Sequence, residues 1–297
     1  MNPLVSVMMP CYNAAATLGM ALASLRAQTY ANWECILVDD GSVDRPDEVV
    51  EQFRDSRIRY VRLDVNKGRP HARNLSTSMA KGDLLAMVDA DDWIYPDKLE
   101  KQVEILMMDR SLAIVSAGMG IVDSGQHLTG VRGLTSSAQA PVFYGRLTRL
   151  QAPPMAYAPS MFRARDVAGL TFDMRYSLGE DMDYLLKLTL GKRYAIINDV
   201  KYIYTEWDTI SLPKAMAGLG LVRKIFTEYS SSFPVRSRYL ALKTLLKMPV
   251  YWGADRLGIW KRLVARRCRR PNAEEIEEFS QALDRVRAMM SVAVRSM

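Results

Sequence analysis

Residues 84–93 place five consecutive apolar residues, LLAMV, directly before three carboxylates within four positions, those of Asp89, Asp91 and Asp92. An unbroken apolar run of this kind is typical of a strand that is buried on both faces. Strand alternation puts Asp89 and Asp91 on one side, where their charges repel unless a cation lies between them. Because such oxygen ligands suit Mg²⁺ or Mn²⁺ carrying a diphosphate, we interpret the stretch as a metal–nucleotide site. The alternative is an acidic, solvated loop that caps the next helix.

The segments before this stretch repeat one order of strand, polar turn and helix. Apolar runs at 4–9, 33–38 and 58–63 precede helical spacing at 14–27, 46–53 and 71–80. This alternation predicts a mostly parallel α/β sheet with helices on both faces, in which ligands bind beyond the C-terminal ends of the strands. Three polar clusters fall at such ends, at residues 10–13, 39–40 and 89–91.

The pattern is less regular in the second half. Residues 118–150 are rich in Gly, Ser and Thr and predict hairpins and a loop over the site. Gly179 then precedes a helix whose first turn carries Glu180 and Asp181, and the helix dipole favours their charged forms. The other expected elements are a helix at 97–108, strands near 112–117, 194–198 and 202–204, and helices beyond residue 212.

Composition excludes several classes of protein. The chain has 297 residues, 49% of them hydrophobic, which is enough for a large core. Its three cysteines are far apart and only two histidines accompany them, which argues against a zinc site or a disulfide framework and indicates a reducing, cytoplasmic compartment. Residues 1–10 predict a first strand and not a signal peptide, and we expect no membrane-spanning helix.

The polar clusters together resemble those of the family 2 glycosyltransferases of the GT-A fold. The matching stretches span residues 4–211 in the family's order and are VSVMMPCYN (5–13), ILVDDGS (36–42), NKG (66–68) with ARN (72–74), VDADD (88–92) and GED (179–181). The resemblance implies a GT-A domain at 1–212, with a nucleotide-binding half at 1–110 and an acceptor half at 111–212, followed by a helical extension at 213–297. It also implies an inverting transfer of a sugar from a nucleoside diphosphate to a hydroxyl group.

The resemblance assigns the nucleotide site residue by residue. Pro10, Tyr12 and Asn13 would line the nucleobase and ribose pocket, although Tyr12 and Asn13 also suit a turn-capping pair. Asp40 would accept the imide hydrogen of the base and thereby select uracil, and Asp89 would contact the ribose. The candidates for phosphate or base-edge contacts are Lys67, Arg69 and Arg73, of which Arg73 fits the family motif; a solvated face is the alternative for each.

The resemblance also assigns the chemistry. Asp181 would be the general base, because inversion needs a carboxylate within hydrogen-bond reach of the attacking hydroxyl. Asp91 would hold the metal ion that neutralises the leaving diphosphate, and Asp92 and Glu180 are secondary candidates beside these two. Ordinary acidity at a helix N-terminus is the alternative for the pair at 180–181.

One position departs from the family pattern. Many members place a metal-side His shortly after the last core strand, but this chain has Trp207 at about that place. Since Trp cannot ligate a metal, either Glu206 or Asp208 substitutes, or Asp91, diphosphate and water hold the ion alone.

The positive charge of the chain is concentrated near its C-terminus. Residues 236–270 contain eleven Lys or Arg against one Asp, whereas the whole chain carries only +7. Apolar and aromatic residues lie between these cations, which predicts basic amphipathic helices in peripheral contact with an anionic membrane, on its cytoplasmic face. A lipid-linked glycan acceptor, as in assembly of cell-surface polysaccharide, would be presented there. The alternative is a solvated bundle that packs its apolar stripe on the catalytic domain.

Three other functions fit less well. A nucleic-acid-binding protein would explain the pI of 9.3, but no such motif is present and the acidic strand ends oppose a polyanion. A dinucleotide-dependent oxidoreductase would need a third glycine after GMG (118–120) or GLG (218–220). A catalytically inactive sugar-nucleotide-binding protein is the remaining alternative, and the presence of both Asp91 and Asp181 argues against it.

Overall fold

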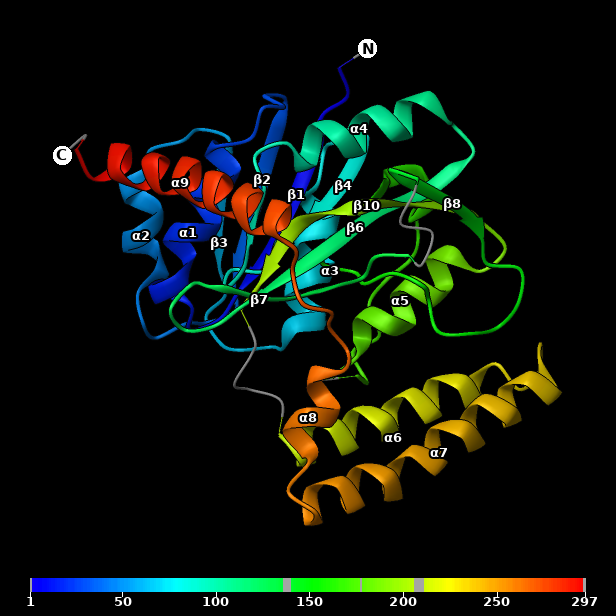
Figure 1. Cartoon of the computed structure of the whole chain (residues 1–297). Coiled ribbons are helices and arrows are strands. Elements are labelled where there is room, and N and C mark those ends of the chain that lie inside the picture. The colour runs from blue at the N-terminus through cyan, green and yellow to red at the C-terminus, as the bar shows by residue number, and fades with distance from the viewer. Residues whose placement is uncertain (1, 136–139, 177, 206–210, 296–297) are drawn as a thin grey trace.

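The computed structural model describes residues 2–135, 140–176, 178–205 and 211–295. Within them, one ten-stranded mixed sheet has the order β3-β2-β1-β4-β9-β6-β10-β5, with β7 paired to β6 and β8 to β10 (Figure 1). The strands are β1 (Val5–Cys11), β2 (Trp33–Asp39), β3 (Ile58–Arg62), β4 (Leu84–Met87), β5 (Trp93–Ile94), β6 (Leu112–Val122), β7 (Leu128–Arg132), β8 (Val142–Arg146), β9 (Met161–Arg163) and β10 (Arg193–Tyr204).

Helices cover both faces of the sheet, as the sequence predicts. They are α1 (Ala15–Arg26), α2 (Pro46–Phe53), α3 (Arg69–Met79), α4 (Lys98–Met108), α5 (Glu180–Thr189), α6 (Leu212–Glu228), α7 (Pro234–Arg256), α8 (Trp260–Ala265) and α9 (Ala273–Arg295). Alternate residues of β1 enter different cores: Val7 and Met9 pack with α1, α4 and α9, whereas Met8 packs with α5 and α6. Both cores are therefore built on the same strands.

The parallel part of the sheet brings the polar clusters to one edge. Strand β1 pairs in parallel with β2 and with β4, so the chain leaves all three strands on the same side. Antiparallel β9 separates β4 from β6, and β10 is a single bulged strand where two short ones are expected. The mixed character of the sheet comes from the strands that follow β4 in the chain.

The glycine pairs considered for a dinucleotide site lie inside regular elements. Gly120 lies inside β6, where a Cβ would come within 2.7 Å of the Ile203 side chain, and Gly218 and Gly220 lie within α6. These glycines do not form a phosphate-binding turn after the first strand, which removes the oxidoreductase alternative.

The last helix returns to the first helices of the chain. In Figure 1, α6 and α7 form a hairpin below the sheet, whereas α9 lies across α1. Phe279, Leu283 and Val286 of α9 are buried in the core shared with α1, and the Phe279 ring lies 5.7 Å from that of Trp93. The proposed division at residue 212 stays a prediction. Among the described residues, no helix is both long and apolar enough to cross a membrane.

Candidate active site

A cavity of about 840 Å³ lies at the C-terminal ends of β1 and β4. The sequence-predicted site residues that line it are Pro10, Tyr12, Asp40, Arg69, Asp89, Asp91, Glu180 and Asp181. Eight of the twelve sequence-predicted site residues thus line one cavity, although they come from five separate segments. The other four, Asn13, Lys67, Arg73 and Asp92, lie beside or behind its wall.

The three carboxylates after β4 differ in surroundings. Asp91 is exposed at the cavity and Asp89 is partly exposed beside it, as strand alternation predicts. Asp92 is 1% exposed and points inward, where its carboxylate accepts hydrogen bonds from the Tyr202 hydroxyl at 2.7 Å and the Thr205 amide at 3.0 Å. Burial, and then the charges of Asp91 and Asp89, raise the pKa of the Asp92 carboxyl. Asp92 therefore does not line the cavity, and it joins the turn after β4 to β10 and Thr205.

The donor set suits a hard divalent cation that arrives with a diphosphate. Asp91 presents carboxylate oxygens at the cavity, the ligand type that Mg²⁺ and Mn²⁺ prefer. Among the residues that the structure describes, no group of three or more His, Cys, Asp and Glu side chains could hold an ion by itself. Phosphate and water oxygens would have to complete the coordination. Glu206 and Asp208, the alternatives to a metal-side His, lie outside the described residues.

The turn after β1 is tied to the turn after β2. Asn13 has a left-handed φ of 49°, donates its amide to the Ser42 hydroxyl and accepts the Val43 amide at 3.0 Å. Asn13 thus has the turn role that was the alternative in the sequence analysis. A contact between Asn13 and a nucleotide stays a prediction. Tyr12, in contrast, is 52% exposed at the cavity.

Asp40 shapes the loop that follows β3. Its two carboxylate oxygens accept the amides of Lys67 at 2.7 Å and Gly68 at 2.8 Å. Gly41 permits the close approach of this loop, because a Cβ there would lie 2.7 Å from the Val65 carbonyl carbon. The sequence alone gave no sign that NKG and DDGS contact each other.

Arg73 is buried behind the cavity wall. It donates to Glu180 Oε1 at 2.8 Å and to Asp89 Oδ1 at 3.4 Å, and its guanidinium lies 5.2 Å from the centre of the Tyr157 ring. Burial lowers the pKa of Arg73, but Asp89 and Glu180 more than offset this, so the net pKa is raised. Arg73 therefore links the carboxylate of Asp89, after β4, to that of Glu180, at the start of α5. The sequence did not reveal this role.

Glu180 and Asp181 begin α5 after Gly179, whose φ of 70° suits glycine. Glu180 is 1% exposed, and burial raises the pKa of its carboxyl while Arg73 lowers it. Asp181 is half-buried at the cavity, and its Oδ1 accepts the Met182 amide at 2.8 Å. Of this acidic pair, Asp181 is the one open to a substrate.

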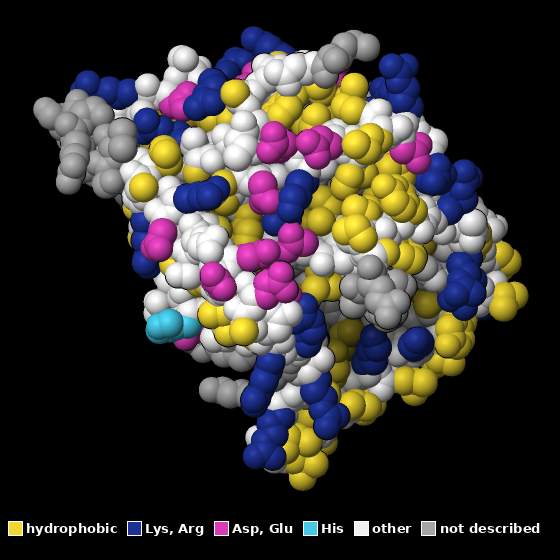
Figure 2. Space-filling view, turned by 45° about the horizontal axis from the view of Figure 1, so that its top comes forward, with side chains coloured by type: hydrophobic (Ala, Val, Ile, Leu, Met, Phe, Trp, Pro, Cys, Tyr) yellow, Lys and Arg dark blue, Asp and Glu magenta, His cyan; other side chains and the backbone are white. Residues whose placement is uncertain are grey.

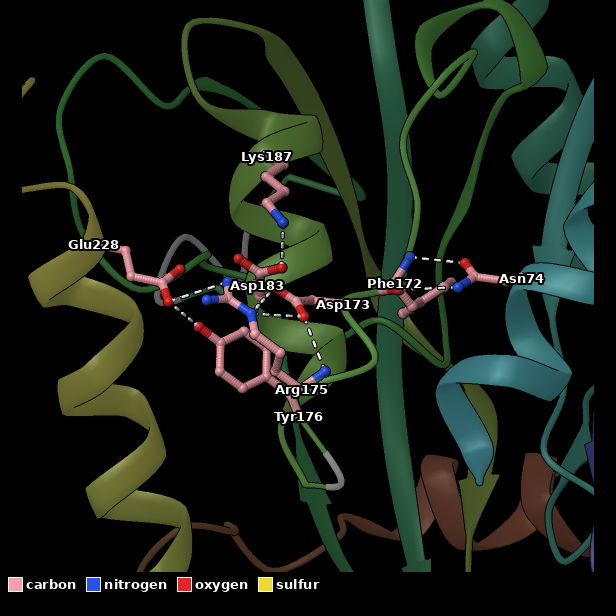
Figure 3. A network of polar contacts seen from close by, with 8 residues as sticks. All are labelled: Asn74, Phe172, Asp173, Arg175, Tyr176, Asp183, Lys187 and Glu228. Carbon is pink, nitrogen blue, oxygen red and sulfur yellow. Dashed lines mark hydrogen bonds and ion pairs between the residues drawn. The ribbon is translucent and has the colours of Figure 1, made fainter. Parts of the chain in front are cut away.

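Polar contacts hold the segment before α5 in place (Figure 3). The Asn74 side chain of α3 accepts the Phe172 amide at 2.7 Å and donates to its carbonyl at 2.9 Å. Glu228 of α6 accepts the Tyr176 hydroxyl at 2.6 Å and pairs with Arg175 at 3.2 Å. The position of Asp181 therefore depends on both α3 and α6.

The C-terminal helices complete the cavity. Their lining residues, all outside the motifs read from the sequence, are Lys214, Ala215, Gly218, Leu219 and Val222 of α6, Tyr251 of α7, and Arg267. No sequence pattern pointed to them, because their place depends on how the hairpin of α6 and α7 packs below α5.

The fold and site define an α/β protein with an acidic cavity suited to a nucleotide and a divalent cation. A family model, glycosyl transferase family 2, matches residues 6–169, and the chain belongs to this family. This confirms the resemblance read from the five motifs.

Curated relatives and solved structures agree with this assignment. The chain is 40% identical over 104 residues to the UDP-Glc:alpha-D-GlcNAc-diphosphoundecaprenol beta-1,3-glucosyltransferase WfgD of Escherichia coli (35% of this chain, 41% of the relative). It is 28% identical over 218 residues to the succinoglycan biosynthesis protein ExoO of Rhizobium meliloti (68% and 60%). It spans about two thirds or less of the length of the curated relatives it matches. The S. aureus TarS 1–349 structure with UDP superposes with a TM-score of 0.66 at 19% identity, covering 98% of this chain and 89% of that one, which confirms the GT-A fold.

Proposed function

We propose that the protein is an inverting glycosyltransferase that moves a sugar from a UDP-sugar to a hydroxyl acceptor. The observation that carries this proposal is that Asp91, after β4, and Asp181, at the start of α5, line one cavity from two distant segments. A cation site beside a second, separate carboxylate suits a reaction in which one group neutralises the leaving diphosphate and another removes the proton of the acceptor.

Uridine as the base of the donor is supported by Asp40 and by relatives. Asp40 lines the cavity, and each of its oxygens keeps a lone pair beyond the loop amides it accepts. TarS has been solved with UDP-GlcNAc, and the name of WfgD includes UDP-Glc. The same fold also occurs in a Pyrobaculum calidifontis mannosyltransferase with GDP-Man and Mn²⁺ (TM-score 0.58). Since the same fold occurs with two different bases, the proposal of uridine rests on Asp40 and on the UDP-sugars named for TarS and WfgD.

Asp91 would hold Mn²⁺ or Mg²⁺ together with the diphosphate. A bound divalent cation supplies Lewis-acid stabilisation of the charge that develops on the leaving group. The protein's own residues orient the reactants: Asp89 and Asp40 on the nucleotide side, and Asp181 on the side of the acceptor, where it takes the hydroxyl proton. Glu180 does not suit this task, because Arg73 already binds its buried carboxylate.

The proposal is tested by nucleoside diphosphate release from a panel of UDP-, GDP- and dTDP-sugars, with and without Mn²⁺ or Mg²⁺. We expect release from a UDP-sugar that requires the metal and that Asp91→Ala abolishes. Release from a GDP-sugar alone would contradict the assignment of Asp40. UDP binding without release from any donor, with a lipid-linked acceptor present, would favour an inactive sugar-nucleotide binder.

We further propose a lipid-linked glycan acceptor, in polysaccharide biosynthesis, and peripheral attachment to the cytoplasmic face of an anionic membrane. The surface that supports this is an apolar stripe on α7, formed by Val235, Tyr239, Leu242, Leu246 and Val250. Their spacing places them on one face of the helix, and all five are between 51% and 82% exposed. The opposite face, with Leu240 and Thr244, is buried against the domain. Packing on the domain thus occupies one face of α7 and leaves a second apolar face outside.

Cations border this stripe on both sides. They are Arg236, Lys243 and Lys247 on one side and Arg238 and Arg256 on the other. Figure 2 shows hydrophobic side chains interspersed with Lys and Arg along the lower right of the molecule. Apolar side chains flanked by cations suit the boundary between lipid tails and anionic headgroups. A second copy of this face would bring like charges together, which favours a membrane over a dimer.

Co-sedimentation with vesicles of phosphatidylglycerol and phosphatidylcholine tests the stripe. We expect Leu242→Glu with Leu246→Glu to weaken binding at low salt by tenfold or more, because two apolar side chains of about 1.5–3 kcal/mol each no longer insert. Met108→Glu, an exposed apolar position on α4, serves as the matched control and should bind as wild type. Wild-type protein that stays in the supernatant at low salt would contradict the proposal.

A further inference from the structure

Two arginines that line the cavity have no carboxylate partner among the described residues. Arg132 ends β7 and Arg267 follows α8, and the structure gives neither an ion pair within the described residues. The Arg132 guanidinium lies 4.8 Å from the centre of the Tyr204 ring, and its Nε is buried with no hydrogen-bond partner. Arg267 donates to the Tyr251 hydroxyl at 3.0 Å. Both guanidinium groups therefore retain unused N–H donors at the cavity.

Backbone pairing fixes the two arginines near each other. Val131 and Arg269 exchange two backbone hydrogen bonds of 2.9 Å, which align the segment after α8 with β7. Gly130 makes room for this segment, because a Cβ there would lie 2.9 Å from the Cβ of Cys268. The segment is also attached to the start of α9, since Arg269 donates to Glu275 at 2.7 Å.

The thiol of Cys268 lies near the charges of both Arg132 and Arg267. Burial raises the pKa of its thiol, and the charges of Arg132 and Arg267 both oppose this rise. The pairing of Val131 with Arg269 also sets Arg132 opposite Cys268, the residue that follows Arg267, so both arginines belong to one short stretch of paired backbone. Since neither arginine has a carboxylate partner among the described residues, an anion that binds between them would receive charge-assisted hydrogen bonds from both.

We propose that Arg132 of β7 and Arg267 of the segment after α8 form a phosphate subsite in this cavity; the subsite rests on the proposed transfer reaction. The planar fork of arginine matches phosphate oxygens in two parallel hydrogen bonds. Two sources of phosphate would reach this cavity: the diphosphate of the sugar nucleotide, and the diphosphate of a lipid-linked acceptor. The subsite would hold the substrate by its charged group while the sugar lies toward Asp181.

Calorimetric titration of Arg132→Gln, Arg267→Gln and the double variant distinguishes the two sources. In the donor arm, UDP is titrated with Mn²⁺ present; in the acceptor arm, farnesyl diphosphate is titrated into protein saturated with UDP. We expect each single variant to weaken one of these ligands about 10- to 100-fold, the range for hydrogen bonds to a charged group. Weaker UDP binding with unchanged uridine binding assigns the subsite to the donor, and weaker farnesyl diphosphate binding assigns it to the acceptor.

Arg270→Gln is the matched control, because Arg270 is an exposed neighbour that does not line the cavity. Circular dichroism melting checks that all variants fold. Unchanged affinities in both arms for the double variant, with UDP bound tightly by wild type, would overturn the subsite and leave the transferase proposal intact. Failure of wild-type protein to bind UDP would overturn the proposed function and the subsite with it.

Discussion

Asp181→Asn is expected to lower kcat by about 10²- to 10⁴-fold, the usual contribution of a general base. The amide keeps the size of the side chain and can still accept the Met182 amide that Asp181 accepts at 2.8 Å. It cannot take a proton from the acceptor hydroxyl. Because the proposed nucleotide contacts come from other segments, which include Tyr12 and Asp40, the affinity for UDP should stay within a few-fold of wild type. Steady-state transfer rates and calorimetric titration with UDP measure the two quantities.

The control for this variant is Glu104→Gln, which makes the same chemical change on the exposed side of α4. It should leave kcat unchanged. If Asp181→Asn retained more than about a tenth of the wild-type kcat, Asp181 would not be the base. If it lost UDP affinity together with kcat, the side chain would belong to the nucleotide site.

Arg73→Leu is expected to destabilise the protein by about 3–5 kcal/mol, since removing one member of a buried ion pair leaves the other charge uncompensated. Arg73 is 3% exposed and Glu180 is 1% exposed, so water cannot replace the lost partner. A urea-unfolding series at neutral pH measures the change. Adding Glu180→Gln to this variant should recover part of the loss, because it removes the uncompensated charge.

Arg69→Leu is the matched control for Arg73→Leu. Arg69 approaches the same Glu180 oxygen at 3.9 Å, but its side chain is 59% exposed, and such surface pairs contribute at most about 1 kcal/mol. A larger loss of stability for Arg69→Leu than for Arg73→Leu would contradict the conclusion that Arg73 is the arginine whose ion pair with Glu180 stabilises the protein. Both substitutions remove a guanidinium beside Glu180, so the comparison tests the effect of burial, although Arg73 also binds Asp89 at 3.4 Å.

Much of the site could be predicted from local patterns because the strands that carry it are consecutive and parallel. An apolar run that stops at a polar cluster marks the end of a buried strand, and parallel strands joined by helices bring those ends to one edge. For this reason the sequence predicts that Pro10, Asp40, Asp89 and Asp91 lie at one edge of the sheet. Short local motifs cannot indicate contacts between segments such as β7 and residue 269, whose pairing depends on the packing of the tail.

The sequence by itself determined the GT-A architecture and the chemical types that meet at the strand ends, because side-chain periodicity follows from backbone geometry. Only the tertiary structure decided which member of each adjacent acidic pair is open to a ligand. Asp91 faces the cavity while Asp92 is bound inside by Tyr202, and Asp181 faces it while Glu180 is bound inside by Arg73. The physical reason is that the partners which bury one carboxylate of each pair are distant along the chain and meet it only once the sheet, α3 and α5 are packed.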